Sequence, residues 1–274
     1  MRIVRAVSEV GDALREPRER GERIGLVPTM GALHAGHTAL MRAARESCDL
    51  VVVTLFVNPA QFNAAEDLER YPKDEGADAS AATDAGADLL FAPSADELYP
   101  PGFDTWVEPG DLATELEGAA RPGHFRGVAT VCAKLFSIVQ PSVAYFGQKD
   151  AQQVAVVRRV VADLNLAVEI ATVATVRDAD GLALSSRNRF LSDGERIIAQ
   201  ALPRAIEAGL AAHRSSGDAV HAARAVLERQ RGLTADYVAV ADFDGPTLVA
   251  AVRVGSVRLI DNARLEAVST APSR

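Results

Sequence analysis

The sequence predicts an α/β protein with a Rossmann-like parallel sheet, followed by a smaller α+β domain. Between residues 24 and 173, apolar runs of strand length alternate with helical stretches, which is typical of a parallel sheet with helices on both faces. The run 50–57 is continuously apolar, as expected for a strand that is covered on both sides. After Thr175 the order changes to two alanine-rich helices and short strands. We therefore expect one domain at 1–175 and a second at 176–274.

The elements of the first domain follow from these patterns in chain order. Strands are expected at the apolar runs 24–27, 50–57, 87–92, 143–147 and 167–173. Helices are expected at 8–20, 37–45, 67–85, 128–139 and 151–164. Residues 116–127 are predicted to form a loop, and residues 105–109 a short edge strand at most.

The second domain begins after a polar loop at 177–189. Ser192 and Glu195 have the spacing of a capping box, which predicts that a helix starts there. Two helices are expected at about 193–213 and 218–231, followed by strands at 236–240 and 249–259. The tail from Val268 is expected to fray.

Length and composition narrow the class of protein. The chain has 274 residues and is 48% hydrophobic, which is enough to bury a substantial core. A formal net charge of −8 argues against a nucleic-acid partner held by broad electrostatics. Cys48 and Cys132 form no CxxC pair, so we expect neither disulfides nor a zinc knuckle, and a reducing compartment. With no signal core and no run that could span a bilayer, we expect a cytoplasmic protein without a membrane partner.

Two histidines, His34 and His37, stand between the first expected strand and its helix. Residues three apart on a first helical turn share one face, and backbone N–H groups at a helix start point toward a bound anion. Gly36 removes a side chain where a ligand would come close. The pattern favours a phosphate site over half of a zinc site, because no further zinc ligand is adjacent. Ordinary surface or core histidines are the alternative.

Two later segments carry cations that suit a phosphate. Lys149, in GQKD at 147–150, follows a strand and opens a helix, at the sheet edge where the histidines are expected. The sequence LSSRN at 184–188 places two hydroxyls and a guanidinium on one loop, and arginine pairs bidentately with phosphate. A solvated lysine and a polar linker are the respective alternatives.

Neutral amides are candidates for binding an organic acid. Gln61 and Gln153 can bind a carboxylate or hydroxyls without fixing a charge, although most glutamines lie on the surface. Asn58 opens the loop that contains Gln61, after a strand. In open α/β sheets, ligands bind at the carboxyl ends of the strands.

Four charged or titratable residues are left with two interpretations each. Arg121 and His124 either contact a substrate or stabilise their loop, and the sequence does not separate these roles. Asp78 and Asp88 are better explained by a solvated helix face than as magnesium ligands.

Six motifs in one order make the chain similar to the pantoate–β-alanine ligase family over nearly its full length. They are PTMGALHAGH at 28–37, FVNPAQF at 56–62, EDLERYP at 66–72, RPGHFRGV at 121–128, YFGQKD at 145–150 with Gln152 and Gln153, and SSRN at 185–188. The family belongs to the cytidylyltransferase-like nucleotidyltransferases, which are marked by HxGH and a KMSKS-type loop. Two residues depart from the family pattern. Leu184 stands where methionine is usual, and Ala151 stands where an aromatic residue is common. Both departures affect how closely the nucleotide fits, and not the reaction.

The resemblance implies a two-step reaction. Pantoate and ATP give pantoyl-adenylate and pyrophosphate, and β-alanine then attacks to give pantothenate and AMP. It also implies that Gln61 and Gln153 hold pantoate and that His37 donates a proton. Beside these, we take Asn58, Arg121 and His124 as further substrate-binding candidates. The residues that it assigns to ATP are Met30, Gly31, His34, Gly36, His37, Gly147, Gln148, Lys149, Asp150, Val176, Leu184, Ser185, Ser186 and Arg187.

The chemistry of the first step explains why such residues are needed. A carboxylate is ionised at neutral pH, so no general base is required. The difficulty is bringing an anion to a polyanion, so we expect catalysis by positioning and charge neutralisation. His34, His37 and Lys149 are expected to act at the α-phosphate, and Mg²⁺ with Ser185, Ser186 and Arg187 at the departing pyrophosphate. The sequence names neither the magnesium ligands nor a base for the second step. The second domain is expected to close as a lid that excludes water.

Two other functions compete with this interpretation. An enzyme of the same superfamily that transfers a nucleotidyl group to a phosphorylated acceptor would share HxGH, but would favour cations where Gln61 and Gln153 stand. A non-catalytic nucleotide-binding regulator would not need both histidines, Lys149 and Arg187. Family members are commonly homodimers, so a homodimer is expected, with 105–109 as a possible pairing strand.

Overall fold

The computed structural model describes residues 1–63, 68–69 and 71–266, and these divide into two compact units. The first comprises Met1–Gly147 and Gln152–Ala174, and the second comprises Gln148–Ala151 and the chain from Thr175 onward. The short segment Gln148–Ala151 therefore belongs with the second unit, although its neighbours in the chain belong to the first. In the part of the chain that the structure describes, no helix combines the length and the apolar character that crossing a membrane requires.

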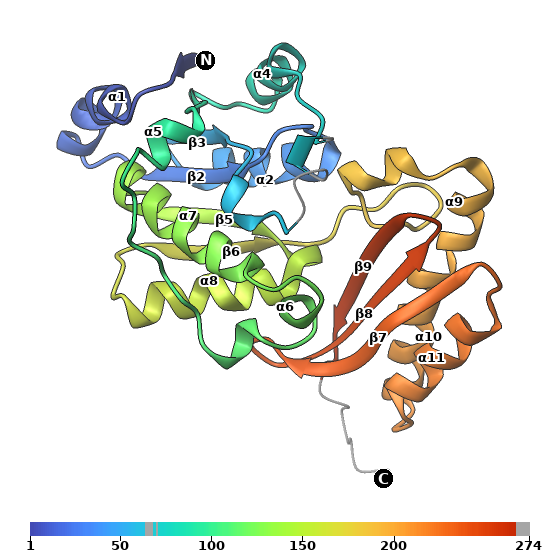
Figure 1. Cartoon of the computed structure of the whole chain (residues 1–274). Helices are drawn as coiled ribbons and strands as arrows, with labels where there is room; N and C mark the ends of the chain where they lie inside the picture. Colours follow the sequence, from blue (N-terminus) through green and yellow to red (C-terminus); the bar gives the residue numbers. More distant parts are fainter. Residues whose placement is uncertain (64–67, 70, 267–274) are drawn as a thin grey trace, which may run out of the picture. The chain divides into compact units, whose positions relative to one another are not determined.

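The first unit contains a six-stranded parallel sheet in the order β1-β4-β3-β2-β5-β6 (Figure 1). Its strands are β1 (Arg2–Val4), β2 (Ile24–Thr29), β3 (Leu50–Leu55), β4 (Leu89–Phe91), β5 (Val143–Gly147) and β6 (Glu169–Val173). The five expected strands are present. The sequence analysis missed β1, because three residues are too few to give a periodic signal.

Helices cover both faces of this sheet, because successive strand residues point to opposite sides. Leu26 and Val52 pack with α1 (Val7–Glu19), α7 (His124–Val139) and α8 (Ala151–Asp163). Val27 and Val53, one position later, pack with α2 (Ala35–Ser47) and α4 (Glu75–Asp84). This two-sided core confirms the predicted Rossmann-like sheet.

Several expectations for the first unit were wrong in detail. Residues 105–109 form no strand; Val107 instead donates its N–H to the Thr130 hydroxyl at 3.0 Å. The expected loop 116–127 holds α6 (Glu117–Ala120) and the first turn of α7. Residue 67 of the expected helix 67–85 and parts of the motif at 66–72 lie outside the described residues, as does the tail from Val268. The remaining short elements are η1 (Pro59–Gln61), α5 (Ala95–Leu98) and η2 (Asp111–Ala113).

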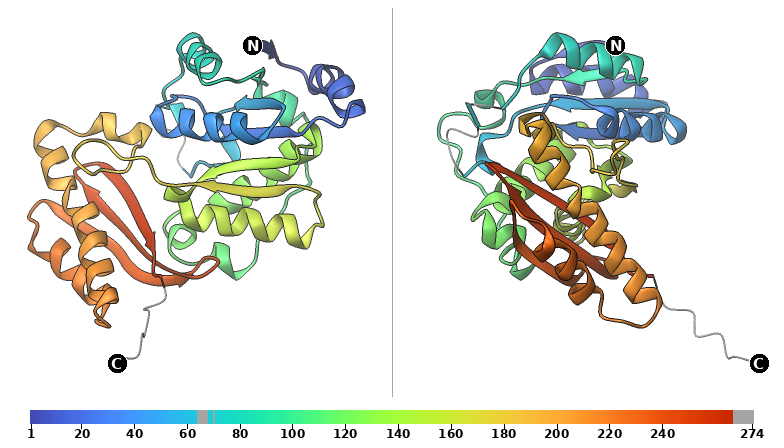
Figure 2. Two further views of the ribbon diagram at one scale, coloured as in Figure 1. Left: turned by 180° about the vertical axis from the view of Figure 1, so that it is seen from behind. Right: turned by 90° about the vertical axis from the view of Figure 1, so that its right-hand side faces the viewer.

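The second unit is an antiparallel sheet in the order β7-β8-β9 with helices on one face (Figure 2). Its strands are β7 (Leu233–Asp242), β8 (Pro246–Val254) and β9 (Val257–Arg264), and its helices are α9 (Asp193–Ala199), α10 (Ala201–Arg214) and α11 (Ala219–Arg229). The predicted strand 249–259 is in fact a hairpin that turns at Gly255, and the predicted helix 193–213 breaks at Gln200. The Ser192 capping box is confirmed.

Candidate active site

The two histidines begin α2 and bind each other's backbone. His34 is the N-cap of the helix, and its Nδ1 accepts the Gly36 N–H at 3.2 Å. Nδ1 of His37 accepts the N–H of His34 at 3.3 Å, and the two ring centroids are 4.1 Å apart. Because both Nδ1 atoms accept N–H groups, the proton of each neutral imidazole lies on Nε2. Each ring therefore carries its N–H donor on Nε2.

The turn before α2 uses its backbone donors internally, which corrects the expectation that they are left for an anion. Asp78, on α4, is 5% exposed and accepts the N–H groups of Ala32 at 3.0 Å and Leu33 at 2.8 Å. Gly31 has φ +86°, and a Cβ there would lie 2.8 Å from Asp78 Oδ2. Asp78 is thus a buried structural group, and the solvated-face interpretation was wrong.

Asp88 is exposed, as the solvated-face interpretation expects, but it lies just before β4 and not on a helix. Its Oδ2 accepts the Val51 N–H at 2.8 Å and pairs with Arg45 at 2.7 Å. The carboxylate therefore fixes the start of β3.

Gln61 is held in one amide orientation by its neighbour Asn58. Gly127 O and Ala60 N–H contact the two ends of the Asn58 amide, at 3.2 and 3.3 Å, so Nδ2 must face the carbonyl and Oδ1 the N–H. Asn58 Nδ2 then donates to Gln61 Oε1 at 3.0 Å. As a result Gln61 turns its Nε2 donor toward Met30, whose sulfur lies 3.0 Å away.

Arg121 and His124 both contact the backbone carbonyl of Gln61. His124 is the first residue of α7. Its Nδ1 lies 2.9 Å from the carbonyl oxygen of Gln61, and its Nε2 lies 3.0 Å from the guanidinium of Arg121. Gly127 lets α7 approach this loop, since a Cβ there would be 2.3 Å from Ala60 O. These contacts give both residues the loop-stabilising role that the sequence left open.

Gln153 and Gln152 are adjacent on the first turn of α8 and differ in their surroundings. Gln152 is buried and binds the backbone of Leu112, Glu115 and Glu117 at 2.8–3.0 Å. Gln153 is half-buried, so its amide is the more accessible of the two. Gly147, the last residue of β5, and Gly36, on the first turn of α2, complete the predicted residues of the first unit.

Lys149 lies in the short helix η3 (Gln148–Asp150) of the second unit. Its Nζ is 3.5 Å from Asp150 Oδ1, and its side chain is 19% exposed. The carbonyls of Gln148 and Lys149 both accept the side-chain amide of Asn262, on β9.

The second cationic segment is a hairpin, residues 176–187, which we call the phosphate hairpin. Leu184 donates its N–H to Val176 O at 2.9 Å, and Arg177 pairs with Ala183 as an antiparallel bridge. Ser185 caps η4 (Ser186–Phe190) by accepting the N–H of Arg187 at 3.3 Å. Ser185 and Ser186 are half-exposed and the Arg187 side chain is exposed. The polar groups at this C-terminal end of the hairpin therefore lie toward solvent, while its paired residues are bonded.

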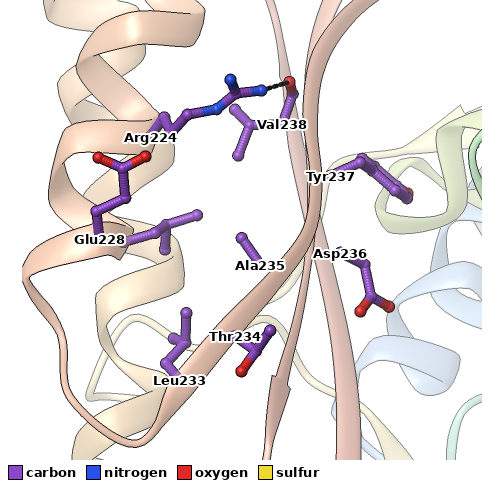
Figure 3. A pocket seen from close by; sticks show the side chains of 9 residues that line it. Arg224, Glu228, Leu233, Thr234, Ala235, Asp236, Tyr237 and Val238 are labelled. Carbon is purple, nitrogen blue, oxygen red and sulfur yellow. Dashed lines mark hydrogen bonds between the residues drawn. The ribbon is translucent and has the colours of Figure 1, made fainter.

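A separate cavity of about 440 Å³ lies between α11 and the first half of β7 (Figure 3). Arg224 and Glu228 line it from the helix, and Arg224 donates to Val238 O at 3.3 Å. Tyr237 points away from the helix in this view. None of the predicted site residues lines this cavity.

No group of three or more His, Cys, Asp or Glu side chains is arranged for metal binding within residues 1–63, 68–69 and 71–266. A magnesium ion that keeps several waters and binds phosphate oxygens needs only one or two protein carboxylates. The described side chains therefore fit a magnesium ion that is already bound to the phosphates of the nucleotide, and not one that the protein holds alone.

The sequence analysis missed several residues that support the site. Tyr99 donates to Asn58 Oδ1 at 2.9 Å, and Asp261 forms two hydrogen bonds with Arg177. Asn262 binds the Lys149 segment. The signal for the last two was present in the sequence, because Asp261 and Asn262 interrupt an apolar strand. A polar pair in such a strand needs buried partners.

Comparisons with known proteins extend over both units. A family model described as pantoate-β-alanine ligase matches residues 2–264. Pantothenate synthetase 1 of Bradyrhizobium diazoefficiens is 51% identical over 279 residues, which cover 96% of this chain and 97% of that protein.

Solved structures give the same result for the fold. A crystal structure of pantothenate synthetase from Thermus thermophilus has a TM-score of 0.92 at 46% identity, covering 97% of this chain and 99% of that one. The pantoate-β-alanine ligase of Francisella tularensis, complexed with β-γ ATP and β-alanine, has a TM-score of 0.83 at 34% identity and full coverage of both chains.

Proposed function

This chain belongs to the pantoate–β-alanine ligase family, and we infer that it condenses pantoate with β-alanine to pantothenate at the expense of ATP. The reaction passes through pantoyl-adenylate and releases pyrophosphate and AMP. The observation that carries this function is the match along residues 2–264, at about half identity to curated pantothenate synthetases. The relative crystallised with β-γ ATP and β-alanine supports the same substrates.

In the first step, the histidines act as neutral hydrogen-bond donors to the α-phosphate. Both rings carry their proton on Nε2 in the observed geometry, because Nδ1 is occupied by a backbone N–H. A preorganised donor stabilises the charge that develops when the carboxylate of pantoate attacks. His37 then acts through its Nε2–H, and the resemblance to the family gives this residue the role of proton donor.

Lys149 and the C-terminal end of the phosphate hairpin neutralise the remaining phosphate charge. Lys149 supplies an ammonium, and Ser185, Ser186 and Arg187 supply two hydroxyls and a guanidinium to the departing pyrophosphate. Mg²⁺ bound to the phosphates would add to this neutralisation when present.

Gln61 and Gln153 hold pantoate, and the direction of the Gln61 amide suits an acid. Its Oε1 is used by Asn58, so the other end of the amide, next to the Met30 sulfur, is the Nε2 donor. A donor binds a carboxylate or a hydroxyl oxygen and adds no net charge to the site. The Gln61→Ala variant should raise the apparent KM for pantoate and leave that for ATP unchanged. An effect on ATP alone would contradict this placement.

The second step needs the neutral amine of β-alanine, and no base is assigned. Closure of the second unit as a lid, a homodimer and a cytoplasmic location stay predictions.

The function is tested by following pyrophosphate release from ATP with and without pantoate, then pantothenate after β-alanine is added. We expect release to depend on pantoate, and AMP and pantothenate to form in equal amounts. A dinucleotide product would instead indicate nucleotidyl transfer, and binding of ATP without turnover would indicate a regulator. Lys149→Ala should slow pyrophosphate release by orders of magnitude with the fold intact.

A further inference from the structure

Asn262, on β9, binds the two peptide carbonyls that flank the start of the Lys149 segment. Its Nδ2 donates to Gln148 O at 3.0 Å and to Lys149 O at 2.7 Å. The residue is 6% exposed, and its Oδ1 is buried without a hydrogen-bond partner. All three residues belong to the second unit.

The direction of this amide is fixed by its partners. Both are carbonyl oxygens, which only accept, so the end of the Asn262 amide that faces them must be the NH₂. Rotating the amide would place an oxygen against two oxygens. Burying Oδ1 without a donor is unfavourable, and a buried unsatisfied atom calls for an explanation beyond stability. The contacts offer such an explanation, because the amide orientation that leaves Oδ1 without a partner is the one that holds the backbone of Lys149 in place.

Asp261, the preceding residue, anchors the phosphate hairpin in the same way. Its side chain is 1% exposed, and its two oxygens accept from Arg177 at 2.7 and 2.9 Å. Arg177 also donates to Gly181 O at 3.0 Å, across the base of the hairpin. Asp261 Oδ1 accepts the Asn262 N–H at 2.8 Å, which ties the two anchors together.

One strand can hold both segments because consecutive strand residues point to opposite faces. β9 is an edge strand of its sheet and lies against both η3, which carries Lys149, and η4, which carries Arg187. A displacement of about 1 Å in a catalytic group can lower a rate by about 100-fold. The spacing between the two cationic segments therefore depends on this pair of residues.

We propose that Asp261 and Asn262 are positioning residues that hold Lys149 and the phosphate hairpin in one fixed arrangement for the phosphates of ATP. This inference rests on the proposed function, in which Lys149 and Arg187 bind those phosphates. Neither Asp261 nor Asn262 touches the nucleotide; each acts through the segment that it anchors.

A double-mutant cycle between Asn262 and Lys149 tests the inference. We measure pantoate-dependent pyrophosphate formation in the full chain for Asn262→Leu, Lys149→Ala and the double variant. Asn262→Leu should lower the rate about 10- to 100-fold. If Asn262 acts through Lys149, the double variant should be no slower than Lys149→Ala alone, within about 3-fold, because residues that act as a unit are not additive.

Thr247→Val is the matched control for loss of a buried polar contact. Thr247 is fully buried on β8 of the same sheet, and its hydroxyl donates to Gly245 O at 3.0 Å. The control should lower the melting temperature about as much as Asn262→Leu and leave the rate of pyrophosphate formation unchanged.

The outcomes separate this inference from the function on which it rests. Losses that multiply in the double variant, or a normal rate for Asn262→Leu beside a slow Lys149→Ala, would overturn the positioning role and leave the function intact. A normal rate for Lys149→Ala would overturn its assigned role in the proposed function. Should Asn262→Leu not fold, Asp261→Asn and Arg187→Ala form a second cycle, for which we expect the same non-additivity.

Discussion

The His34–His37 turn and the phosphate hairpin carry comparable groups but are built differently. In the turn, the N–H groups of Ala32, Leu33, His34 and Gly36 all bind side chains of the same unit. In the hairpin, bonds concentrate at the base, from Arg177 to Asp261 and from Asn188 to Ala183 O, and the Arg187 side chain is exposed.

This difference indicates how each region meets ATP. The turn fixes the imidazoles before a ligand arrives, so its donors lose little freedom on binding. The hairpin fixes only its backbone, so Arg187 must order its long side chain when phosphate binds. We therefore expect changes in the turn to affect the chemical step, and changes to the Arg196 contacts of the hairpin, which lie apart from the Asp261 anchor, to act mainly on stability.

The largest effect is expected from removing the Nε2–H of His37. His37→Ala should slow adenylate formation by about 10²–10³-fold, since a preorganised donor to developing charge is worth about 2.7–4 kcal/mol. Single-turnover pyrophosphate release measures this. His37→Asn can still accept the His34 N–H through its oxygen, so it should keep wild-type stability and be slow nevertheless. If the asparagine variant were fast, the role of His37 would be structural.

Asp78→Asn tests whether the turn depends on its buried acceptor. An amide can accept only one of the two N–H groups and turns its NH₂ toward the other, which should destabilise the protein by about 1–3 kcal/mol. We expect adenylate formation to fall about 10-fold as well, because the histidines follow this turn. Urea unfolding and pyrophosphate release give the two values.

The matched control for Asp78→Asn is Asp88→Asn. Asp88 also accepts a backbone N–H, from Val51, but its contacts lie at the start of β3 and away from the histidines. This variant should alter stability alone. A similar loss of rate in both variants would show that the turn is not specifically coupled to Asp78.

A smaller effect is expected from Tyr99→Phe, which removes the donor to Asn58 Oδ1. Burial raises the pKa of Tyr99, so the hydroxyl stays protonated and donates. One neutral hydrogen bond is worth about 0.5–1.5 kcal/mol, so the KM for pantoate should rise about 2- to 10-fold with little change in kcat. Tyr145→Phe removes a hydroxyl that contacts Ser47 and Cys48, and should leave this KM unchanged.

Sequence periodicity was sufficient to predict the main strands of the parallel sheet. It did not reveal the shortest strand, or the turn and the break inside two longer regular stretches of the second unit. The runs at β2, β3 and β5 were recognised because their apolar pattern is long and bounded by turns. β8 and β9 were read as one strand, since Gly255 and Ser256 are the only turn-forming residues between positions 249 and 259. The break at Gln200 did have a signal that the sequence analysis did not use: Pro203 lacks the N–H that a continuous helix needs, and it lies in the first turn of α10.

The candidate site could be named from motifs, but its supports could not. HxGH, GQKD and SSRN are local patterns, so their residues are visible in sequence. The partners that hold them are distant: Asp78 binds Ala32 across 46 positions, and Asn262 binds Lys149 across 113. No spacing rule encodes such pairs, and only the folded chain brings them together.

The smallest effect is expected at the turn of the phosphate hairpin, from Arg196→Gln. Arg196 donates to Asp180 at 2.7 Å and to Asp178 at 2.6 Å. Partial burial acts to raise the pKa of Asp180, but the hydrogen bonds from Arg196 and the Leu182 N–H outweigh it and lower the pKa. A lowered carboxyl pKa stabilises the fold above the unfolded value of about 3.9, and this is lost as the pH falls through the folded pKa. The variant should therefore lose less than about 1 kcal/mol at pH 7, and its difference from wild type in urea unfolding should shrink toward pH 3. A difference that stayed constant with pH would show that the stabilisation does not come from the lowered Asp180 pKa. A large fall in pyrophosphate release would mean that the hairpin turn is coupled to the chemistry in the same way as the histidine turn.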